Sequence, residues 1–281
     1  MAAGGARKGD ERPAPLASAG ELSSEVPKDH PRRRSLEMRE RLAKAVEAGL
    51  AHPTGLTAHG RGEAFDYLLG ERTQPEAEAA EKAAAEVLLA AQRPVVSVNG
   101  NVAALAAAEL AELQEAVNGK RHDRRPLALE ANVFHAGDER IRKIVEVLED
   151  AGAEHVLGRE RKANIPGLSS HRALTAPEGI FAADAVLVPL EDGDRAEALK
   201  KMGKVVVAVD LNPLSRTALA ADITVVDHVV RALPRIGDAA RRTDKMPHLG
   251  VKALAKRFDN AANLAAVRRR IAAALEGRAG A

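Results

Sequence analysis

The sequence predicts an α/β fold, namely a doubly wound and mainly parallel sheet with helical additions at both ends. Six short apolar segments have the length and the β-branched content of buried strands, at about 94–98, 127–130, 155–157, 185–189, 205–209 and 223–226. Segments with helical patterning separate most of them, and this alternation favours parallel connections over hairpins. No internal repeat is apparent.

Length and composition limit the classes of protein. The chain has 281 residues, enough for one large or two small domains, and 46% of them are hydrophobic. Lys and Arg number 42 against 40 Asp and Glu, a balance that disfavours a dedicated nucleic-acid binder. The absence of cysteine excludes disulfides, thiolate metal sites and cysteine nucleophiles. No apolar run reaches the roughly 18 residues of a membrane span, and the N-terminus lacks a signal-peptide pattern, so we expect a cytoplasmic protein.

The chain divides into a tail and one domain. Residues 1–27 are rich in Ala, Gly, Pro and Ser, and we expect a disordered tail. Residues 28–281 are expected to form a single domain, with a helical part at 28–92, the sheet core at 93–230 and further helices at 231–281. Ser35 is the predicted N-cap of a helix that ends near Leu50.

The first informative stretch lies around Arg61. Gly60 and Gly62 flank this arginine and predict a tight loop that leads into a helix, where a phosphate would meet both the guanidinium and free N–H groups. His59 is equally suited to contacting substrate and to capping the loop. Phe65 and Tyr67 are expected to pack the loop onto the core.

The next signals mark helix starts and a turn. Residues 73–76, Thr-Gln-Pro-Glu, resemble a capping box before a helix that reaches about residue 92. After the strand at 94–98, the sequence Asn99-Gly100-Asn101 precedes a helix at 102–117. Gly100 at this junction suits a phosphate or carboxylate cradle, although one glycine turn is a weak signal.

Polar residues also follow the middle strands. Asn132 comes after the strand at 127–130, on the carboxyl side where ligands collect. The irregular segment 158–179 is longer than most connections, and such loops are often functional. Asp194 and Glu197 fit an N-cap pair. Glu191 and Asp192 suit either Mg²⁺ or amine binding, or an exposed turn, and the sequence leaves both open.

The richest stretch is Val205–Asp227. Its first strand ends at Asp210, and the polar residues Asn212, Ser215, Arg216 and Thr217 follow. The next strand ends at Asp227 and His228. In open α/β sheets the crevice at the carboxyl ends of the strands binds ligands, so we expect this stretch to form a wall of an active site. Helices are predicted beyond it at 229–241, with a kink or break at Pro234, and at 251–258 and 264–275.

The inventory of residues favours phosphoryl or adenylyl transfer. The glycine fingerprint of NAD sites is missing after the strand at 94–98, which disfavours an oxidoreductase. There is no Ser–His–Asp order, no metal-ligand cluster and no Walker A lysine. Arginines, asparagines and glycine turns instead suit catalysis by positioning and charge neutralisation of an anionic, nucleotide-type substrate.

Four motifs extend this interpretation by resemblance. They are HGRGEAFDYLLGERT at 59–73, PVVSVNGNVAAL at 94–105, VPLEDGDR at 188–195 and VDLNPLSRTALAADITVVD at 209–227. In this order they resemble the archaeal phosphopantothenate synthetases, also called 4-phosphopantoate–β-alanine ligases. The resemblance, from about residue 30 to residue 241, implies a Rossmann-like homodimer. It also implies an enzyme of coenzyme A biosynthesis that joins 4-phosphopantoate to β-alanine with ATP and Mg²⁺, through an acyl-adenylate, giving AMP and diphosphate.

The resemblance also implies roles for single residues. Those of ATP binding fall on Arg39, Arg61, Asp210, Leu211, Asn212, Arg216, Thr217, His228 and Val229, and those of phosphopantoate binding on His59, Gly100, Asn101 and Asn132. Arg61, Asn101 and Arg216 are the expected catalytic residues, and no metal ligand is assigned. Thr217 stands where serine is expected, and His228 where asparagine is expected. A surface salt bridge is the alternative role for Arg39.

Three other functions remain as alternatives. A nucleotide or coenzyme A sensor would keep the ATP wall without using the substrate loops. An NAD(P)-dependent oxidoreductase would use the same sheet, but it lacks its glycine fingerprint. RNA binding depends only on Arg32–Arg34 and the basic tails, and the near-neutral net charge disfavours it.

Overall fold

One parallel sheet forms the centre of the molecule. The computed structural model describes residues 27, 29–30, 32–133, 137–168 and 173–279. The predicted tail at 1–27 therefore lies outside them except for Pro27. The sheet has six parallel strands in the order β3-β2-β1-β6-β7-β8. Their bounds are β1 Pro94–Val98, β2 Ala128–Ala131, β3 Val156–Leu157, β6 Ala185–Pro189, β7 Val205–Val209 and β8 Ile223–Val225. This confirms the predicted Rossmann-like α/β class.

The strand order reverses between β1 and β6. From β1 the chain moves outward through β2 to β3, and it then returns to place β6 on the other side of β1. The loops that follow these two central strands therefore diverge and leave a crevice between them. A small antiparallel hairpin, β4 (Ala163–Asn164) and β5 (Leu174–Thr175), lies in the irregular segment before β6 and was not predicted.

Helices cover both faces of the sheet, because successive strand residues point to opposite sides. In β6, Ala185 and Leu187 join the larger core, whereas Val186 and Val188 join the smaller one. The larger core is packed by α3 (Pro75–Ala90), α4 (Gly100–Asn118), α5 (Asp138–Asp150), α8 (Val229–Arg242) and α9 (Val251–Lys256). The smaller core is packed by α6 (Gly193–Lys201) and by Ile165, Ile180 and Ala183. The short helix α7 (Arg216–Ala220) packs against α6.

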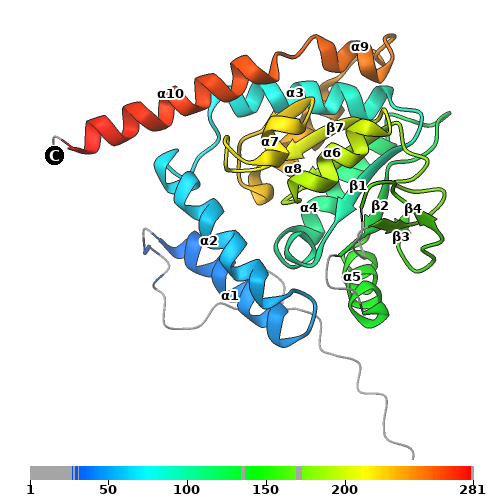
Figure 1. Ribbon diagram of the computed structural model, residues 1–281, viewed down its shortest axis with the longest axis horizontal. Coiled ribbons are helices and arrows are strands. Elements are labelled where there is room, and N and C mark those ends of the chain that lie inside the picture. The colour runs from blue at the N-terminus through cyan, green and yellow to red at the C-terminus, as the bar shows by residue number, and fades with distance from the viewer. Residues whose placement is uncertain (1–26, 28, 31, 134–136, 169–172, 280–281) are drawn as a thin grey trace, which may run out of the picture.

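The remaining helices lie at the margin of this sandwich (Figure 1). The first two, α1 (Arg33–Glu47) and α2 (Pro53–Leu68), lie side by side in the lower left of the view, and α1 buries Met38, Leu42 and Ala45 in the larger core. The last, α10 (Asn260–Ala279), buries Leu264 and Val267 and then extends beyond the rest of the molecule, where Leu275 is 52% exposed. No helix within the described residues is both long and apolar enough to cross a bilayer.

Several predicted helix caps were wrong. For Ser35 and Thr73 the reason is that a distant carboxylate accepts from the hydroxyl. Ser35 lies inside α1 and donates to Glu63 at 2.6 Å. Gln74, not Thr73, occupies the N-cap of α3, and the Thr73 hydroxyl donates to Asp227 at 2.6 Å. Asp192 occupies the N-cap of α6, so the predicted pairing of Asp194 with Glu197 does not form there. Pro234 lies within α8 and does not end it.

The predicted loop around Arg61 was also wrong. Residues 53–68 form the continuous helix α2, which starts at Pro53 after the N-cap His52. Proline at the first helical position and the His52 side chain, which accepts from the N–H of Thr54 at 3.3 Å, account for the early start. Tyr67 does not pack the core either, since it is 60% exposed.

Gly60→Ala is expected to stabilise the protein. Gly60 is exposed and helical, and a Cβ added there meets no atom of the described structure within 4 Å. Alanine is favoured over glycine in a helix by roughly 0.5–1 kcal/mol. Thermal unfolding should show a Tm raised by a few degrees, whereas a lower Tm would contradict the helical assignment of this segment.

Candidate functional site

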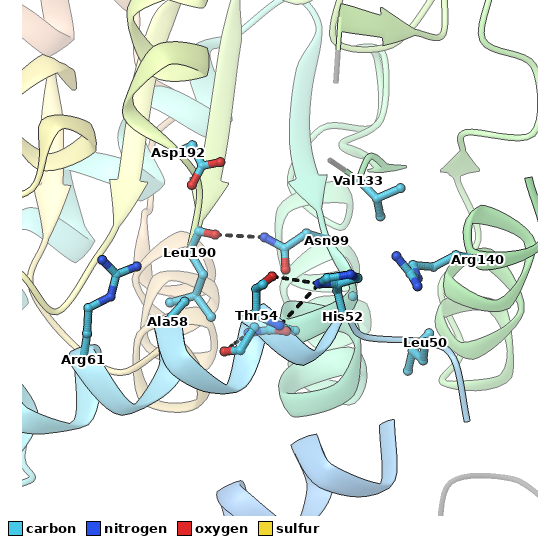
Figure 2. A pocket seen from close by; sticks show the side chains of 13 residues that line it. Leu50, His52, Thr54, Ala58, Arg61, Asn99, Val133, Arg140, Leu190 and Asp192 are labelled. Atoms are coloured by element: carbon cyan, nitrogen blue, oxygen red, sulfur yellow. Dashed lines mark hydrogen bonds between the residues drawn. The ribbon is translucent and has the colours of Figure 1, made fainter. Parts of the chain in front are cut away.

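A pocket lies at the crevice between β1 and β6 (Figure 2). Its volume of about 310 Å³ is at the small end of the range for small-molecule sites. It is lined by Leu50, His52, Thr54, Gly55, Ala58, Arg61, Asn99, Gly100, Asn101, Val133, Arg140, Leu190 and Asp192. The pocket therefore lies where the strand order reverses, at the carboxyl ends of β1 and β6, as is usual for ligand sites in open α/β sheets. This is one strand away from β7, where the stretch Val205–Asp227 begins.

Asn99 and Leu190 shape the floor of the pocket. The Asn99 side chain caps α4 by accepting from the Val102 N–H at 3.1 Å, and its amide donates to the Leu190 carbonyl at 2.9 Å. Leu190 has a φ of +50°, a left-handed conformation that a branched side chain rarely adopts. The contact between Asn99 and Leu190 thus joins the loops after β1 and β6 and holds a strained residue at the site.

The helix α2 crosses the carboxyl edge of the sheet. Near its start, the Asn101 amide donates to the Gly55 carbonyl at 2.9 Å. Farther along, a Cβ at Gly62 would lie 3.4 Å from the Leu211 side chain after β7. The rings of His59 and His228 meet edge to face with centroids 5.8 Å apart. This helix therefore brings predicted residues from three strand ends together, which the sequence did not reveal.

Two glycines allow this close packing. A Cβ at Gly55 would lie 2.2 Å from the Asn101 Oδ1 atom, and a Cβ at Gly100 would lie 2.2 Å from the Leu50 carbonyl oxygen. Gly100 was predicted as an anion cradle. Gly100 does line the pocket. However, the space left by its missing side chain is occupied by the Leu50 backbone.

Arg61 is a cation that faces the pocket from α2. Its side chain is exposed, and it forms no hydrogen bond or ion pair with the part of the chain that the structure describes. Arg140, on the opposite side of the pocket in Figure 2, donates to the Gly49 carbonyl at 3.2 Å. An anionic ligand could therefore meet Arg61 without breaking an existing salt bridge.

The segment after β7 is organised by its own polar residues. Asp210 accepts from the Asn212 N–H at 2.9 Å and also from the Ser215 hydroxyl, and burial raises the pKa of its carboxyl. The Ser215 side chain caps α7. Thr217 is buried and donates to the Glu191 carbonyl at 2.7 Å, whereas Arg216 is exposed and pairs with Glu197 at 3.0 Å.

A buried polar network lies at the ends of β1, β2 and β6. The fully buried Arg195 donates to the Asn132 side chain and pairs with Glu191 at 3.6 Å, and Ser97 also donates to Glu191. The Asn132 amide donates to the Leu174 carbonyl at 2.9 Å. Asn132, predicted to bind substrate, thus has structural partners on both ends of its amide.

A second buried acid holds the long segment before β6. Glu130 accepts from the N–H groups of Ala176 at 3.0 Å and Ile180 at 2.6 Å. Desolvation by burial raises its pKa to about 7 in spite of these bonds. The long irregular segment is therefore fastened to the end of β2.

His228 is buried and caps α8, and its Nδ1 accepts from the Val230 N–H at 3.3 Å. Burial lowers its pKa to about 3, and the positive charge of Arg231 and the neighbouring His59 act in the same direction. Burial also lowers the pKa of His59, whose Nε2 has no hydrogen-bond partner among the described residues. Both rings are therefore neutral at pH 7.

His228→Asn is expected to make the protein less sensitive to acid. Between pH 3 and 6.5 the unfolded state binds a proton at this histidine and the folded state does not, so stability is lost as the pH falls below 6.5. Asparagine keeps an N-cap acceptor without titrating. Unfolding by urea at pH 7 and pH 5 should show a difference of about 2 kcal/mol in favour of the variant at the lower pH. The exposed His122, changed to Asn, is the control, and equal behaviour of the two variants would contradict the prediction.

Of the predicted site residues, Arg61, Gly100 and Asn101 line the pocket and the others do not. Arg39 pairs with Glu63 at 2.9 Å on the side of α2 that faces α1. Val229 is buried in the larger core. The sequence predicted no site role for His52, Thr54, Asn99 or Arg140, all of which line the pocket. Asn99 follows a predicted strand directly, which is the signal that could have identified it.

The described residues contain no group of three or more His, Asp or Glu side chains arranged for a metal ion. One carboxylate, that of Asp192, lines the pocket.

The comparisons with known proteins identify the family. A family model described as phosphopantothenate/pantothenate synthetase matches residues 76–274. The chain belongs to this family. Among the relatives is a 4-phosphopantoate–β-alanine ligase of Thermococcus kodakarensis, 49% identical over 243 residues, which are 86% of this chain and 90% of the relative.

Two further relatives are also named 4-phosphopantoate–β-alanine ligase. That of Methanosarcina mazei is 46% identical and the match covers 84% of this chain and 90% of the relative. That of Methanospirillum hungatei is 50% identical, and the match covers 78% of this chain and 86% of the relative. The resemblance predicted from four motifs is therefore confirmed as membership of the synthetase family. The part of the chain that the family model matches begins at residue 76, after α2. The match therefore does not include Arg61 or the other pocket residues of α2.

Proposed function

We propose that the chain is an ATP-dependent ligase that condenses 4-phosphopantoate with β-alanine. The observation that supports this most directly is the pocket at the reversal of the strand order, where Arg61 has no partner in the described structure. Both substrates of the first step are polyanions, and a pocket that holds them together needs fixed cations and amide donors.

The chemistry follows from the poor reactivity of a carboxylate. The carboxylate oxygen of 4-phosphopantoate attacks the α-phosphorus of ATP and diphosphate leaves. The product is an acyl-adenylate, a mixed anhydride of the carboxylate and AMP. The neutral amine of β-alanine then attacks its acyl carbon. AMP leaves with the electron pair of the broken C–O bond, and the amine proton passes to solvent.

We assign the residues of the site as follows. Arg61 meets phosphate oxygens of the reacting groups, and Asn101 orients the carboxylate. His59, Gly100 and Asn132 lie on the phosphopantoate side. The ATP side is formed by Arg39, Asp210, Leu211, Asn212, Arg216, Thr217, His228 and Val229. Among these, Arg39 and Arg216 would have to exchange the partners Glu63 and Glu197 for phosphate.

Mg²⁺ fits this site as a companion of ATP. In nucleotide sites the phosphates and water supply most of its ligands, so one or two carboxylates suffice. Asp192 is the carboxylate on the pocket wall that we assign to this role. When bound, the ion would offset phosphate charge.

The test is an assay of purified protein with ATP, Mg²⁺, 4-phosphopantoate and β-alanine, followed for AMP. AMP and diphosphate should appear in a 1:1 ratio only when both other substrates are present. Formation of ADP would instead indicate an acyl-phosphate, and ATP binding without turnover would favour a nucleotide sensor.

We further propose that the enzyme acts as a homodimer in the cytoplasm. The end of α10 extends beyond the body of the molecule (Figure 1). Leu275 on this helix and Tyr67 on α2 are exposed. Apolar side chains on projecting elements suit a subunit interface. Light scattering should give about twice the mass of one chain, and the mass of one chain would refute the dimer.

A further inference from the structure

The helix that carries Arg61 is held in place by polar contacts. Asp66 is the only residue of α2 that is buried, and Leu56 on the same helix is 38% exposed. A surface helix is usually fixed by a broad apolar stripe, which α2 lacks. Its position therefore depends on a few hydrogen bonds and ion pairs.

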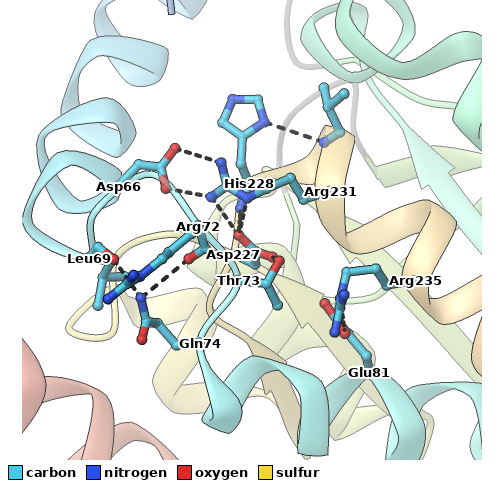
Figure 3. Close-up of polar contacts among 11 residues, drawn as sticks. Asp66, Leu69, Arg72, Thr73, Gln74, Glu81, Asp227, His228, Arg231 and Arg235 are labelled. Atoms are coloured by element: carbon cyan, nitrogen blue, oxygen red, sulfur yellow. Dashed lines mark hydrogen bonds and ion pairs between the residues drawn. The ribbon is translucent and has the colours of Figure 1, made fainter. Parts of the chain in front are cut away.

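Glu63 joins α2 to α1 through Ser35 at 2.6 Å and Arg39 at 2.9 Å. The contacts that hold α2 to the rest of the domain lie on either side of Arg61. On the N-terminal side, Asn101 holds the Gly55 carbonyl. On the C-terminal side, Arg231 of α8 donates from Nη1 to the Asp66 carboxylate at 3.1 Å (Figure 3). Arg61 and Asp66 are five residues apart, about 7.5 Å along the helix axis. Movement at this anchor would therefore displace the guanidinium of Arg61.

Arg231 also contacts the end of β8. Its Nε donates to Asp227 at 2.8 Å, and the second Asp227 oxygen accepts from Thr73 at 2.6 Å. The side chains of Arg231, Asp66 and Asp227 are 11%, 10% and 1% exposed. A planar guanidinium can serve two carboxylates at once, which a lysine cannot do in the same geometry.

We propose that Arg231 is a positioning residue that fixes α2, and with it Arg61, over the carboxyl edge of the sheet. This inference rests on the proposed function only for its effect on turnover. Arg231 lies outside the set of residues assigned to ligands, and it acts through Asp66.

Arg235 provides a matched control one turn farther along α8. It pairs with Glu81 and Glu78 of α3, each at 2.8 Å, and it does not hold α2. Replacing either arginine by glutamine removes a partner of a buried carboxylate. The two variants thus lose comparable internal contacts but differ in which helix is released.

Hydrogen exchange of the full chain is the first measurement. In Arg231→Gln, amides of residues 53–68 should exchange at least tenfold faster than in the native protein, whereas Arg235→Gln should leave them within twofold. Asp66→Asn, which leaves Arg231 paired with Asp227, should reproduce the first result and serves if Arg231→Gln does not fold. Unchanged exchange in this segment would overturn the proposal, whether or not the protein forms AMP.

Turnover is the second measurement. A misplacement of about 1 Å can lower a rate by roughly 100-fold, so Arg231→Gln should lower kcat/KM for ATP by about 10- to 100-fold. Arg235→Gln should change it less than twofold, and Arg231→Lys should recover only part of the loss. In an Arg61→Ala background, Arg231→Gln should have less than a twofold further effect, because the group that it positions is gone. Multiplicative losses in that background would show that Arg231 does not act through Arg61.

Discussion

Replacing Arg61 by alanine is expected to reduce AMP formation by about 10²- to 10³-fold. Removal of one fixed donor to a developing oxyanion lowers rates by this amount in other enzymes. The side chain faces the pocket and has no hydrogen bond or ion pair with the described part of the chain. The folded state therefore loses no hydrogen bond or ion pair, and the main effect should fall on turnover.

The assay should pair this variant with Arg268→Ala. Arg268 is an exposed arginine of α10 and does not line the pocket. Both variants should unfold within about 1 °C of the native protein, because substitutions of exposed residues usually change stability by less than about 0.5 kcal/mol. Native-like turnover by Arg61→Ala would show that the phosphate site lies elsewhere.

Gly100→Ala is expected to damage both stability and turnover. The added Cβ would lie 2.2 Å from the Leu50 carbonyl oxygen and 3.0 Å from the Ala51 Cα, and these backbone atoms cannot rotate away. Overpacking of this kind costs about 1–3 kcal/mol, and we expect the upper part of that range. Relief of the clash would displace the start of α4, which holds Asn99 and Asn101 at the pocket.

Gly60→Ala is the control for this substitution, since the same methyl group meets open space there. Urea unfolding should give a larger free energy of unfolding for Gly60→Ala than for the native protein, and a smaller one for Gly100→Ala. Gly100→Ala should also turn over more slowly even at temperatures where it is fully folded. A stable and fully active Gly100→Ala protein would mean that the segment before α2 moves freely.

The strands were predicted well because their signals are local. Each strand of a doubly wound sheet is buried on both faces, so it is a short run of apolar residues between turn formers, as at Val205–Val209. Gly100 and Asn101, which follow β1, were recognised for the same reason. The hairpin of β4 (Ala163–Asn164) and β5 (Leu174–Thr175) was missed, because neither strand lies in a run of apolar residues.

The helix around Arg61 shows where local signals fail. Two glycines in four residues predicted a loop, yet the start is fixed by Pro53 and His52, and the helix is then held by Asn101 and Arg231. The preference of glycine for irregular backbone amounts to only about 1 kcal/mol per residue in a helix. A few tertiary hydrogen bonds are enough to exceed it.

By itself, the sequence determined the α/β class, the strand positions and the family. Strands that are buried on both faces are continuous apolar runs, and each of the four motifs is also a continuous stretch of the chain, so both can be recognised without the fold. Only the tertiary structure decided which polar side chains serve the pocket. Ser35 and Thr73 suited helix caps locally, but both donate to distant carboxylates instead. A cap and a tertiary hydrogen bond each contribute about 1 kcal/mol, so the choice between them depends on the partners that the fold brings near.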